Sequence, residues 1–153
     1  MKLQRLQTAV AGLWAGLLLG VGGVSAPSLF MVLDRPLAGL GAGRIFATEA
    51  RLSLFIAVLL YVLERRRVRD LAESGATGSV LTGNLLLMLA ALFLTIFGQF
   101  ALHPMIEAAK AGEATLLSFG ALHGISAALF WIKTLCVVVL AWRLTGLTPT
   151  TQP

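Results

Sequence analysis

The sequence predicts an all-α, polytopic membrane four-helix bundle with both chain termini in the cytoplasm. Three observations predict this: the composition, four long apolar segments, and basic residues gathered on one side of those segments. Of the 153 residues, 58% are hydrophobic and only 12% are charged, whereas soluble domains carry about a quarter charged residues. So few ionic groups cannot cover a surface that faces water. We therefore expect residues 1–153 to form a single transmembrane domain that faces the lipid bilayer.

The first segment is one of four that reach the roughly 20 apolar residues needed to cross a bilayer. It contains Gly12, Gly16 and Gly20, a spacing that lets another helix approach its backbone closely. Pro27 lacks a backbone donor, so we expect a kink or a break near residues 25–28. The four predicted helices cover approximately residues 7–33, 37–63, 80–102 and 116–142.

The second segment is unusual because its purely apolar part, residues 54–63, is too short to cross a bilayer alone. Arg44, Glu49 and Arg51 are therefore expected in or just above the membrane. The sequence leaves open whether residues 36–46 lie flat at the membrane interface. The third segment is the most uniformly apolar, and the fourth carries two ionisable side chains.

The basic residues indicate the orientation. The loops on one side carry Arg35 and Lys110, whereas the other side collects Lys2, Arg5, Arg65, Arg66, Arg67, Arg69 and Arg143. Short loops rich in Lys and Arg stay in the cytoplasm, so both termini are predicted there, and we expect the bacterial inner (plasma) membrane. The basic clusters have no interleaved aromatic residues and no nucleic-acid motif, so no nucleic-acid partner is expected.

Charged side chains at membrane depth are costly and usually face the bundle interior or a water-filled cavity. Glu49 is the only carboxylate predicted at that depth, and we expect it to be ionised and paired, with Lys133 and Arg51 as leading candidates. Lys133 either binds an anion or relays protons, or it only forms a structural pair or extends to the headgroups. Arg44 is close enough to the boundary to reach the headgroups, although an anionic group in the bundle would also match it.

Two helical faces carry the remaining candidates. On the fourth helix, an inward face is predicted from helical spacing for His123, Ser126, Phe130, Lys133, Thr134 and Val137. On the third helix, a polar stripe comprises Asn84, Met88, Thr95, Gln99 and His103. Such polar residues most often make hydrogen bonds between helices, although a transport pathway would use the same residues.

A metal or haem site has weak candidates in His103 and His123, with Met105 or Glu107 nearby. A structural, hydrogen-bonded His123 is the preferred interpretation, and the lone Cys136 is interpreted as a packing residue. No nucleophile–base pair, phosphate loop or carboxylate pair is apparent. The expectation is therefore a protein without cofactors and without catalytic activity.

Several local patterns resemble the transmembrane protein 205-like family, a membrane family also catalogued as a domain of unknown function. The patterns are Ala26-Pro27-Ser28-Leu29-Phe30, Leu33-Asp34-Arg35, Ala38-Gly39, Gly43-Arg44-Ile45-Phe46, His103-Pro104-Met105 and Phe119-Gly120-Ala121-Leu122-His123-Gly124-Ile125-Ser126. Members often have another residue at the position of His103 and Asn at that of Phe130. The resemblance implies a four-helix membrane protein with no established reaction, and eukaryotic relatives are linked to tolerance of toxic small molecules.

Three functions are compatible with these features. The first is a transport or toxic-compound tolerance component, which would use Arg51, Glu49, Lys133 and His123. Four helices make a thin transporter, so a homo-oligomer or a membrane partner protein is expected. The second is a non-catalytic assembly or scaffold protein whose polar residues only hold the bundle together. The third, less favoured, is a haem- or metal-binding redox protein.

Overall fold

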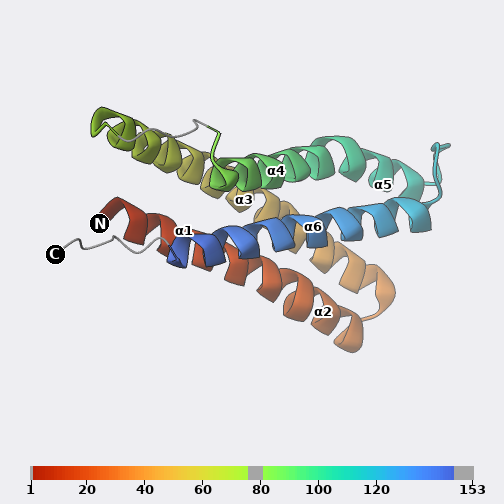
Figure 1. The fold of residues 1–153 in the computed structure, drawn as a ribbon. Helices are drawn as coiled ribbons and strands as arrows, with labels where there is room; N and C mark the ends of the chain where they lie inside the picture. Colours follow the sequence, from red (N-terminus) through yellow and green to blue (C-terminus); the bar gives the residue numbers. More distant parts are fainter. Residues whose placement is uncertain (1, 76–80, 147–153) are drawn as a thin grey trace.

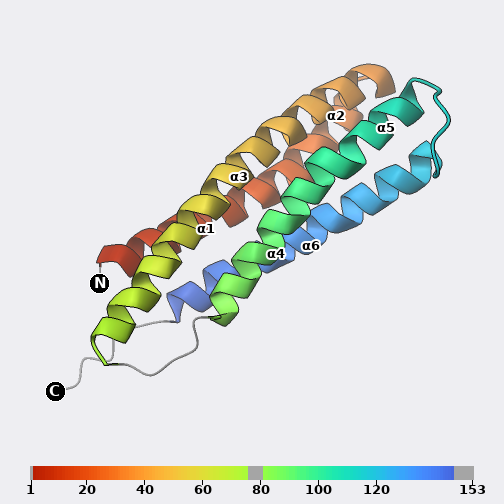
Figure 2. The same cartoon turned by 90° about the horizontal axis from the view of Figure 1, so that it is seen from above.

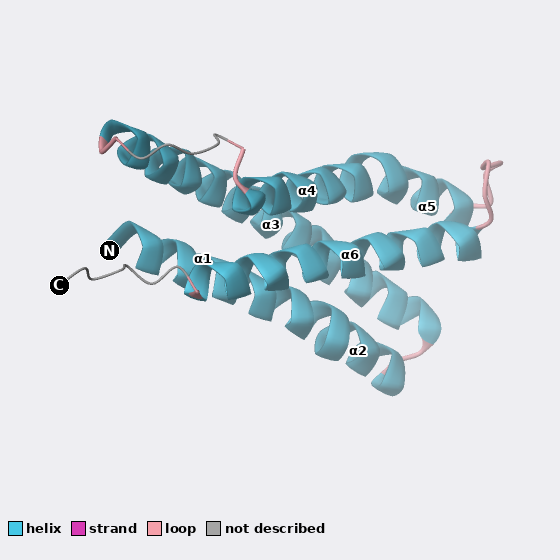
Figure 3. Cartoon of the chain, in the orientation of Figure 1, coloured by secondary structure: helices cyan, strands magenta, loops and turns pink. Residues whose placement is uncertain are grey.

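The computed structural model describes residues 2–75 and 81–146. All regular structure in these ranges is helical (Figure 3). Four of the continuous helical stretches are long and apolar enough to cross a membrane, which makes the chain a membrane protein. In order, the elements are α1 (Lys2–Gly20), η1 (Val21–Ser25), α2 (Ala26–Val32), α3 (Arg35–Glu73), α4 (Gly83–Phe97), η2 (Gly98–Leu102), α5 (His103–Lys110) and α6 (Phe119–Thr145).

Three of the four long helices begin with a side-chain cap. The Asp34 carboxylate accepts from the Leu37 N–H at 2.9 Å, and the Thr82 hydroxyl accepts from the Leu85 N–H at 3.1 Å. Ser118 caps α6 in the same way. Each cap satisfies a backbone donor that the first helical turn leaves without a partner.

The first and third long helices each contain a π-helical turn that ends two residues before a proline. In η1 the Ala26 N–H bonds to the carbonyl of Val21, and in η2 the His103 N–H bonds to that of Gly98. The extra residue in each turn shifts the hydrogen-bond register, so the following proline fits without ending the helix. The helical hydrogen bonds thus change register near Pro27, but the first helix continues past it. The third helix likewise continues past Pro104.

The four long helices form a bundle in which α1 and α4 each pack against both α3 and α6 (Figures 1 and 2). We call the end with the chain termini the terminal end, and the end with the α2–α3 and α5–α6 connections the loop end. Toward the loop end the contacts divide, because α2 lies against α3 and η1 whereas α5 lies against α6 and η2. Figure 1 shows these two pairs as arms that diverge toward the loop end.

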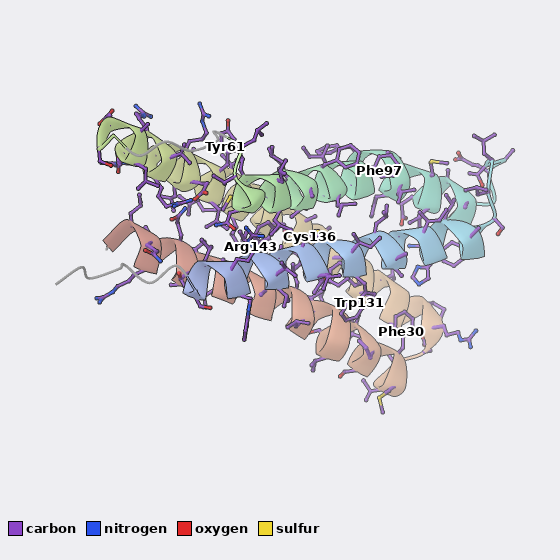
Figure 4. The ribbon with its side chains drawn as sticks, viewed as in Figure 1. Phe30, Tyr61, Phe97, Trp131, Cys136 and Arg143 are labelled. Atoms are coloured by element: carbon purple, nitrogen blue, oxygen red, sulfur yellow. The ribbon has the colours of Figure 1, made fainter. Side chains whose placement is uncertain are left out.

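The hydrophobic core occupies the terminal half of the bundle. Its buried members are Ala11, Trp14, Ala15, Leu18, Ala57, Leu60, Met88, Ala91, Val137, Leu140 and Leu144. By contrast, α2 and α5 contribute no buried side chain. Toward the loop end, within the residues that the structure describes, Leu122 is the one large apolar side chain that is fully buried. Phe30, Phe97 and Trp131, labelled in Figure 4, are among many large apolar residues exposed on the outside, as expected of a surface that faces lipid.

The second long helix differs most from the sequence prediction. It runs from Arg35 to Glu73 without a break, so residues 36–46 continue the same helix and do not form a separate segment. The basic cluster of residues 65–69 lies on the last turns of α3, where we had expected a loop. Helix-forming residues such as Leu, Arg and Glu dominate that stretch, and nothing in it terminates a helix before Gly75 at φ 83°.

Candidate functional site

A buried ion pair connects α3 and α6 midway along the bundle. The Lys133 ammonium donates to both carboxylate oxygens of Glu49, at 2.8 and 2.9 Å. Lys133 is 5% exposed and Glu49 is 3% exposed. Each lies about 21 Å along its helix from the start of that helix, at the α-helical rise per residue. The expected pairing of Glu49 is present, and its partner is Lys133, not Arg51.

A chain of hydrogen bonds extends the pair to α1. The Trp14 indole N–H donates to the Ser53 hydroxyl at 2.7 Å, and this hydroxyl in turn donates to Glu49 Oε1. Ser53 follows Glu49 by one helical turn on the same buried face of α3. The carboxylate therefore receives donors from two helices, and the indole fixes the orientation of the hydroxyl that reaches it.

Aromatic rings cover the ion pair on the side toward the loop end. Phe46 and Phe130 precede Glu49 and Lys133 by about one turn, and their rings meet edge to face with centroids 5.1 Å apart. The Lys133 nitrogen lies 5.1 Å from the centroid of the Phe130 ring, within the range of a cation–π contact. A Cβ atom on Gly22 would overlap the Phe130 ring, so glycine at this position lets η1 approach α6 closely.

Residues 9–115 match the family described as Domain of unknown function (DUF4149). The match covers more than half of the chain. The chain belongs to this family. No curated protein and no solved structure gives a significant match. In this DUF4149 protein the matched region contains Trp14, Glu49 and Ser53, whereas Lys133 lies on α6, beyond it.

A second buried carboxylate, Glu64, was missed by the sequence analysis. Its side chain is fully buried near the terminal end of the DUF4149 bundle and accepts four hydrogen bonds. Arg67 donates from Nε and Nη2 at 2.8 and 2.7 Å, Thr82 at 2.8 Å, and Gln7 at 3.0 Å. Gln7 is also buried, and its Oε1 is the buried side-chain atom without a partner in the described part of the chain.

The signal for Glu64 lay in sequence spacing. Glu64 and Arg67 are three residues apart, which places them on one helical face. The second helix predicted from the sequence covers approximately residues 37–63, so Glu64 lies just outside it. A continuous helix would have placed it on the same face as Leu60 and Ala57, both buried.

The terminal ends of α4 and α6 are tied by an interhelical hydrogen bond. Arg143 Nε donates to Asn84 Oδ1 at 3.0 Å, as expected for a polar residue on the third helix. Gly83 leaves space for the guanidinium, since a Cβ there would approach Arg143 Nη2 to 2.8 Å. Thr95, also buried, instead donates to the carbonyl of Ala91 on its own helix at 2.8 Å.

Other predicted site residues lie apart from the ion pair. Arg44 and Arg51 are exposed on the outer face of α3, and neither forms an ion pair within residues 2–75 and 81–146. Gln99 and Ser126 are half-buried. His123 is exposed and stacks on Phe119, with ring centroids 5.9 Å apart, so its predicted inward orientation is wrong. In this arm α6 packs against α5 and η2, and Leu122, next to His123, is the residue that α6 buries there.

The structure gives little support to the candidate ligands for a metal or haem. His103 is half-buried on α5, and His123 is exposed on α6. Among the residues that the structure describes, no group of three or more His, Cys, Asp or Glu side chains is close enough to hold a metal ion. Within this range the ion pair of Glu49 and Lys133 is therefore the stronger candidate for a functional site.

Proposed function

We propose that this DUF4149 protein is a membrane transport component, and that the ion pair of Glu49 and Lys133 is the element that responds to the solute. The observation that carries the proposal is the position of the pair: buried midway along the bundle, where the two arms begin to diverge. A buried ion pair is weak evidence for stability, because well-packed apolar residues often do as well in its place. An ionisable pair at membrane depth is by default a functional hypothesis.

The two π-helical turns support the same proposal. η1 and η2 occur in α1–α2 and α4–α5 where the contacts divide between the arms. Such turns are frequent at functional sites because they disturb the regular hydrogen bonding of a helix. In the proposed mechanism, the arms change their separation at these turns while the terminal half stays closed.

The orientation completes this proposal. The terminal end, with its basic residues, faces the cytoplasmic side of a bacterial inner membrane, and the arms open toward the opposite side. Cysteines at Glu73 and Glu113, which are both exposed, test this with a membrane-impermeant thiol reagent. We expect labelling of Glu113→Cys from outside intact cells and of Glu73→Cys only after permeabilisation. Labelling of both from the same side would contradict the four-helix topology.

A homo-oligomer is part of the proposal. Gly12 and Gly16 are exposed, and a Cβ on either would meet nothing within 4 Å in the chain. This small-residue face is open to a second helix, as the spacing predicts. The resemblance to the transmembrane protein 205-like family suggests that the solute is a toxic small molecule. The proposal assigns the protein no catalytic activity.

A flux measurement tests the proposal. The purified protein is reconstituted into liposomes, and uptake of a panel of small amphipathic compounds of positive, neutral and negative charge is followed. We expect protein-dependent uptake of at least one class, and its loss in the double variant Glu49→Gln/Lys133→Met, which keeps the pair neutral. Uptake by neither protein would remove the transport proposal.

A scaffold function is the second candidate, and the closed hydrogen-bond networks favour it. Trp14, Ser53, Glu49 and Lys133 all have partners within the chain, and so do the oxygens of Glu64. Networks of this kind hold helices in one arrangement. A scaffold predicts that the double variant keeps every function of the parent, provided that it remains folded.

A further inference from the structure

We propose that Glu49, Phe46 and Phe130 form a binding site for hydrophobic organic ammonium ions, and that the Lys133 ammonium is its built-in competitor. This inference rests on the proposed transport function and names the class of solute. It comes from the fact that the site already holds a cation: the charged end of the chain's own lysine.

The contacts of Lys133 describe the site's chemistry. Its ammonium group touches both oxygens of one carboxylate and lies over the face of an aromatic ring. A carboxylate together with aromatic faces is the arrangement that recognises ammonium ligands, because the ring quadrupole and the anion attract the same charge. A free ammonium ion of similar size would make the same contacts.

The surroundings select against anions. Glu49 supplies the negative charge, and the structure pairs it with one cation. Arg44 and Arg51, the other cations of α3 at this depth, are exposed on a different face. An anion that displaced Glu49 from Lys133 would leave a buried carboxylate without a partner, at a high cost in free energy.

The rings make the site suitable for a hydrophobic ion. Phe46 and Phe130 are half-buried on the side of the pair that faces the diverging arms. They separate the charges from the arms, so a ligand that reaches Glu49 from the arms must offer apolar surface to these rings. An ammonium group joined to an aromatic or aliphatic body fulfils both requirements.

Charge balance defines the exchange. When the ligand ammonium takes the place of Lys133 on the Glu49 carboxylate, an ammonium on Lys133 would be left buried without an anion. Lys133 then releases one proton as the cation enters, so the net charge of the site does not change. Glu49 on α3 is the charged group that faces Lys133, whereas the buried side chains from α1 and α4 at this level, Trp14, Leu18, Ala91 and Thr95, carry no charge.

Calorimetric titration of the purified full-length chain in detergent tests this site. Three probes share one body and differ in charge: phenethylammonium, phenethyl alcohol and phenylacetate. We expect the ammonium probe to bind at least about tenfold more tightly than the other two, with release of one proton per ion bound, measured from the dependence of the heat on the buffer. Tighter binding of phenylacetate, or no proton release, would overturn the inference.

Variants distinguish binding at this site from non-specific binding to the protein or detergent. Glu49→Gln/Lys133→Met should abolish binding of phenethylammonium, and Phe130→Leu should weaken it by about fivefold. Arg51→Met, on the exposed face of α3, is the matched control and should bind as the parent does. Affinity that is the same in the double variant and in the parent would refute the role of Glu49.

The failures of the two proposals are distinguishable. If liposomes take up phenylacetate and phenethylammonium does not bind, transport stands and the organic-cation site fails. If phenethylammonium binds through Glu49 and no compound of the panel is taken up, the site stands and transport fails.

Discussion

The two halves of the bundle are held together in different ways. In the terminal half, α1, α3, α4 and α6 meet around a continuous apolar core, and a hydrogen-bond network around Glu64 joins α1, α3 and the start of α4. In the loop half the helices pair into two arms, and α2 and α5 bury no side chain. The difference indicates that the terminal half contains most of the buried apolar packing that stabilises the fold, whereas the loop half contributes less of it.

The two buried carboxylates repeat this contrast. Glu64 accepts from Arg67, Thr82 and Gln7, and its cation Arg67 follows it by three residues on the same helix. Glu49 depends for its charge on Lys133, which is far away in the sequence and has a long flexible stem. The cation that pairs with Glu64 lies on the same helix, which suits a structural role, whereas the cation that pairs with Glu49 lies on another helix, which suits exchange.

The largest effect is expected from breaking the pair at the boundary between the halves. Glu49→Gln leaves the Lys133 ammonium buried without an anion, so we expect the free energy of unfolding to fall by about 3–5 kcal/mol. The double variant Glu49→Gln/Lys133→Met should recover most of that loss. Chemical unfolding in detergent measures both, with Arg51→Met as an exposed control near zero change. A single variant as stable as the parent would show that the pair is not needed for folding.

The core of the terminal half is expected to give the next largest effect. Leu140 is fully buried, whereas Leu135 on the same helix is 63% exposed. Leu140→Ala should destabilise the protein by about 2–4 kcal/mol through the cavity that it leaves. Leu135→Ala should change stability by less than about 0.5 kcal/mol, since its side chain faces lipid. Equal losses in the two variants would contradict the packing of α6.

A smaller loss is expected at Glu64. Glu64→Gln keeps one oxygen, which can accept from Thr82 or from Gln7 but not from both, and removes the charge that Arg67 contacts. Because the Arg67 side chain is 23% exposed, its charge can reach water, unlike that of Lys133. We expect a loss of about 1–3 kcal/mol, below that of Glu49→Gln in the same unfolding measurement. A larger loss at Glu64 than at Glu49 would reverse the roles that we assign to the two carboxylates.

The sequence predicted the four apolar helices because apolar length depends only on composition along the chain. It also predicted that Glu49 needs a cation, because that follows from charge and depth alone. The choice of Lys133 over Arg51 depends on how α3 and α6 are rotated toward each other, which local spacing does not determine. Arg51 is two residues from Glu49, so it points to another face of the same helix.

The inward orientation of His123 was wrong for a related reason. Helical spacing correctly grouped Lys133, Thr134 and Val137, which are all buried. Extending the same face by three turns toward His123 assumes that a neighbouring helix continues beside it. Toward the loop end α6 packs against α5 and η2, and this packing buries Leu122 and leaves His123 exposed. Side-chain periodicity predicts a face, but the burial of that face depends on the packing of the whole bundle.

The smallest loss of stability is expected in η1, at the point where the arms begin to diverge. Gly22 and Gly23 are adjacent in η1, yet a Cβ on Gly22 would overlap Phe130, whereas one on Gly23 would meet nothing within 4 Å. Gly22→Ala should therefore destabilise the protein by about 1–2 kcal/mol because the Phe130 ring must move. Gly23→Ala should be neutral or slightly stabilising, since alanine favours helix.

A double-mutant cycle shows whether that loss arises at the ring. If Phe130 is the cause, Phe130→Leu should remove most of the penalty of Gly22→Ala, giving a coupling free energy of about 1 kcal/mol in unfolding experiments. Gly23→Ala combined with Phe130→Leu should be additive. Additivity in both pairs would mean that η1 and α6 do not meet at this contact. The aromatic cover over Glu49 and Lys133 would then lack its support from η1, and the boundary between the closed and the diverging half would lie elsewhere.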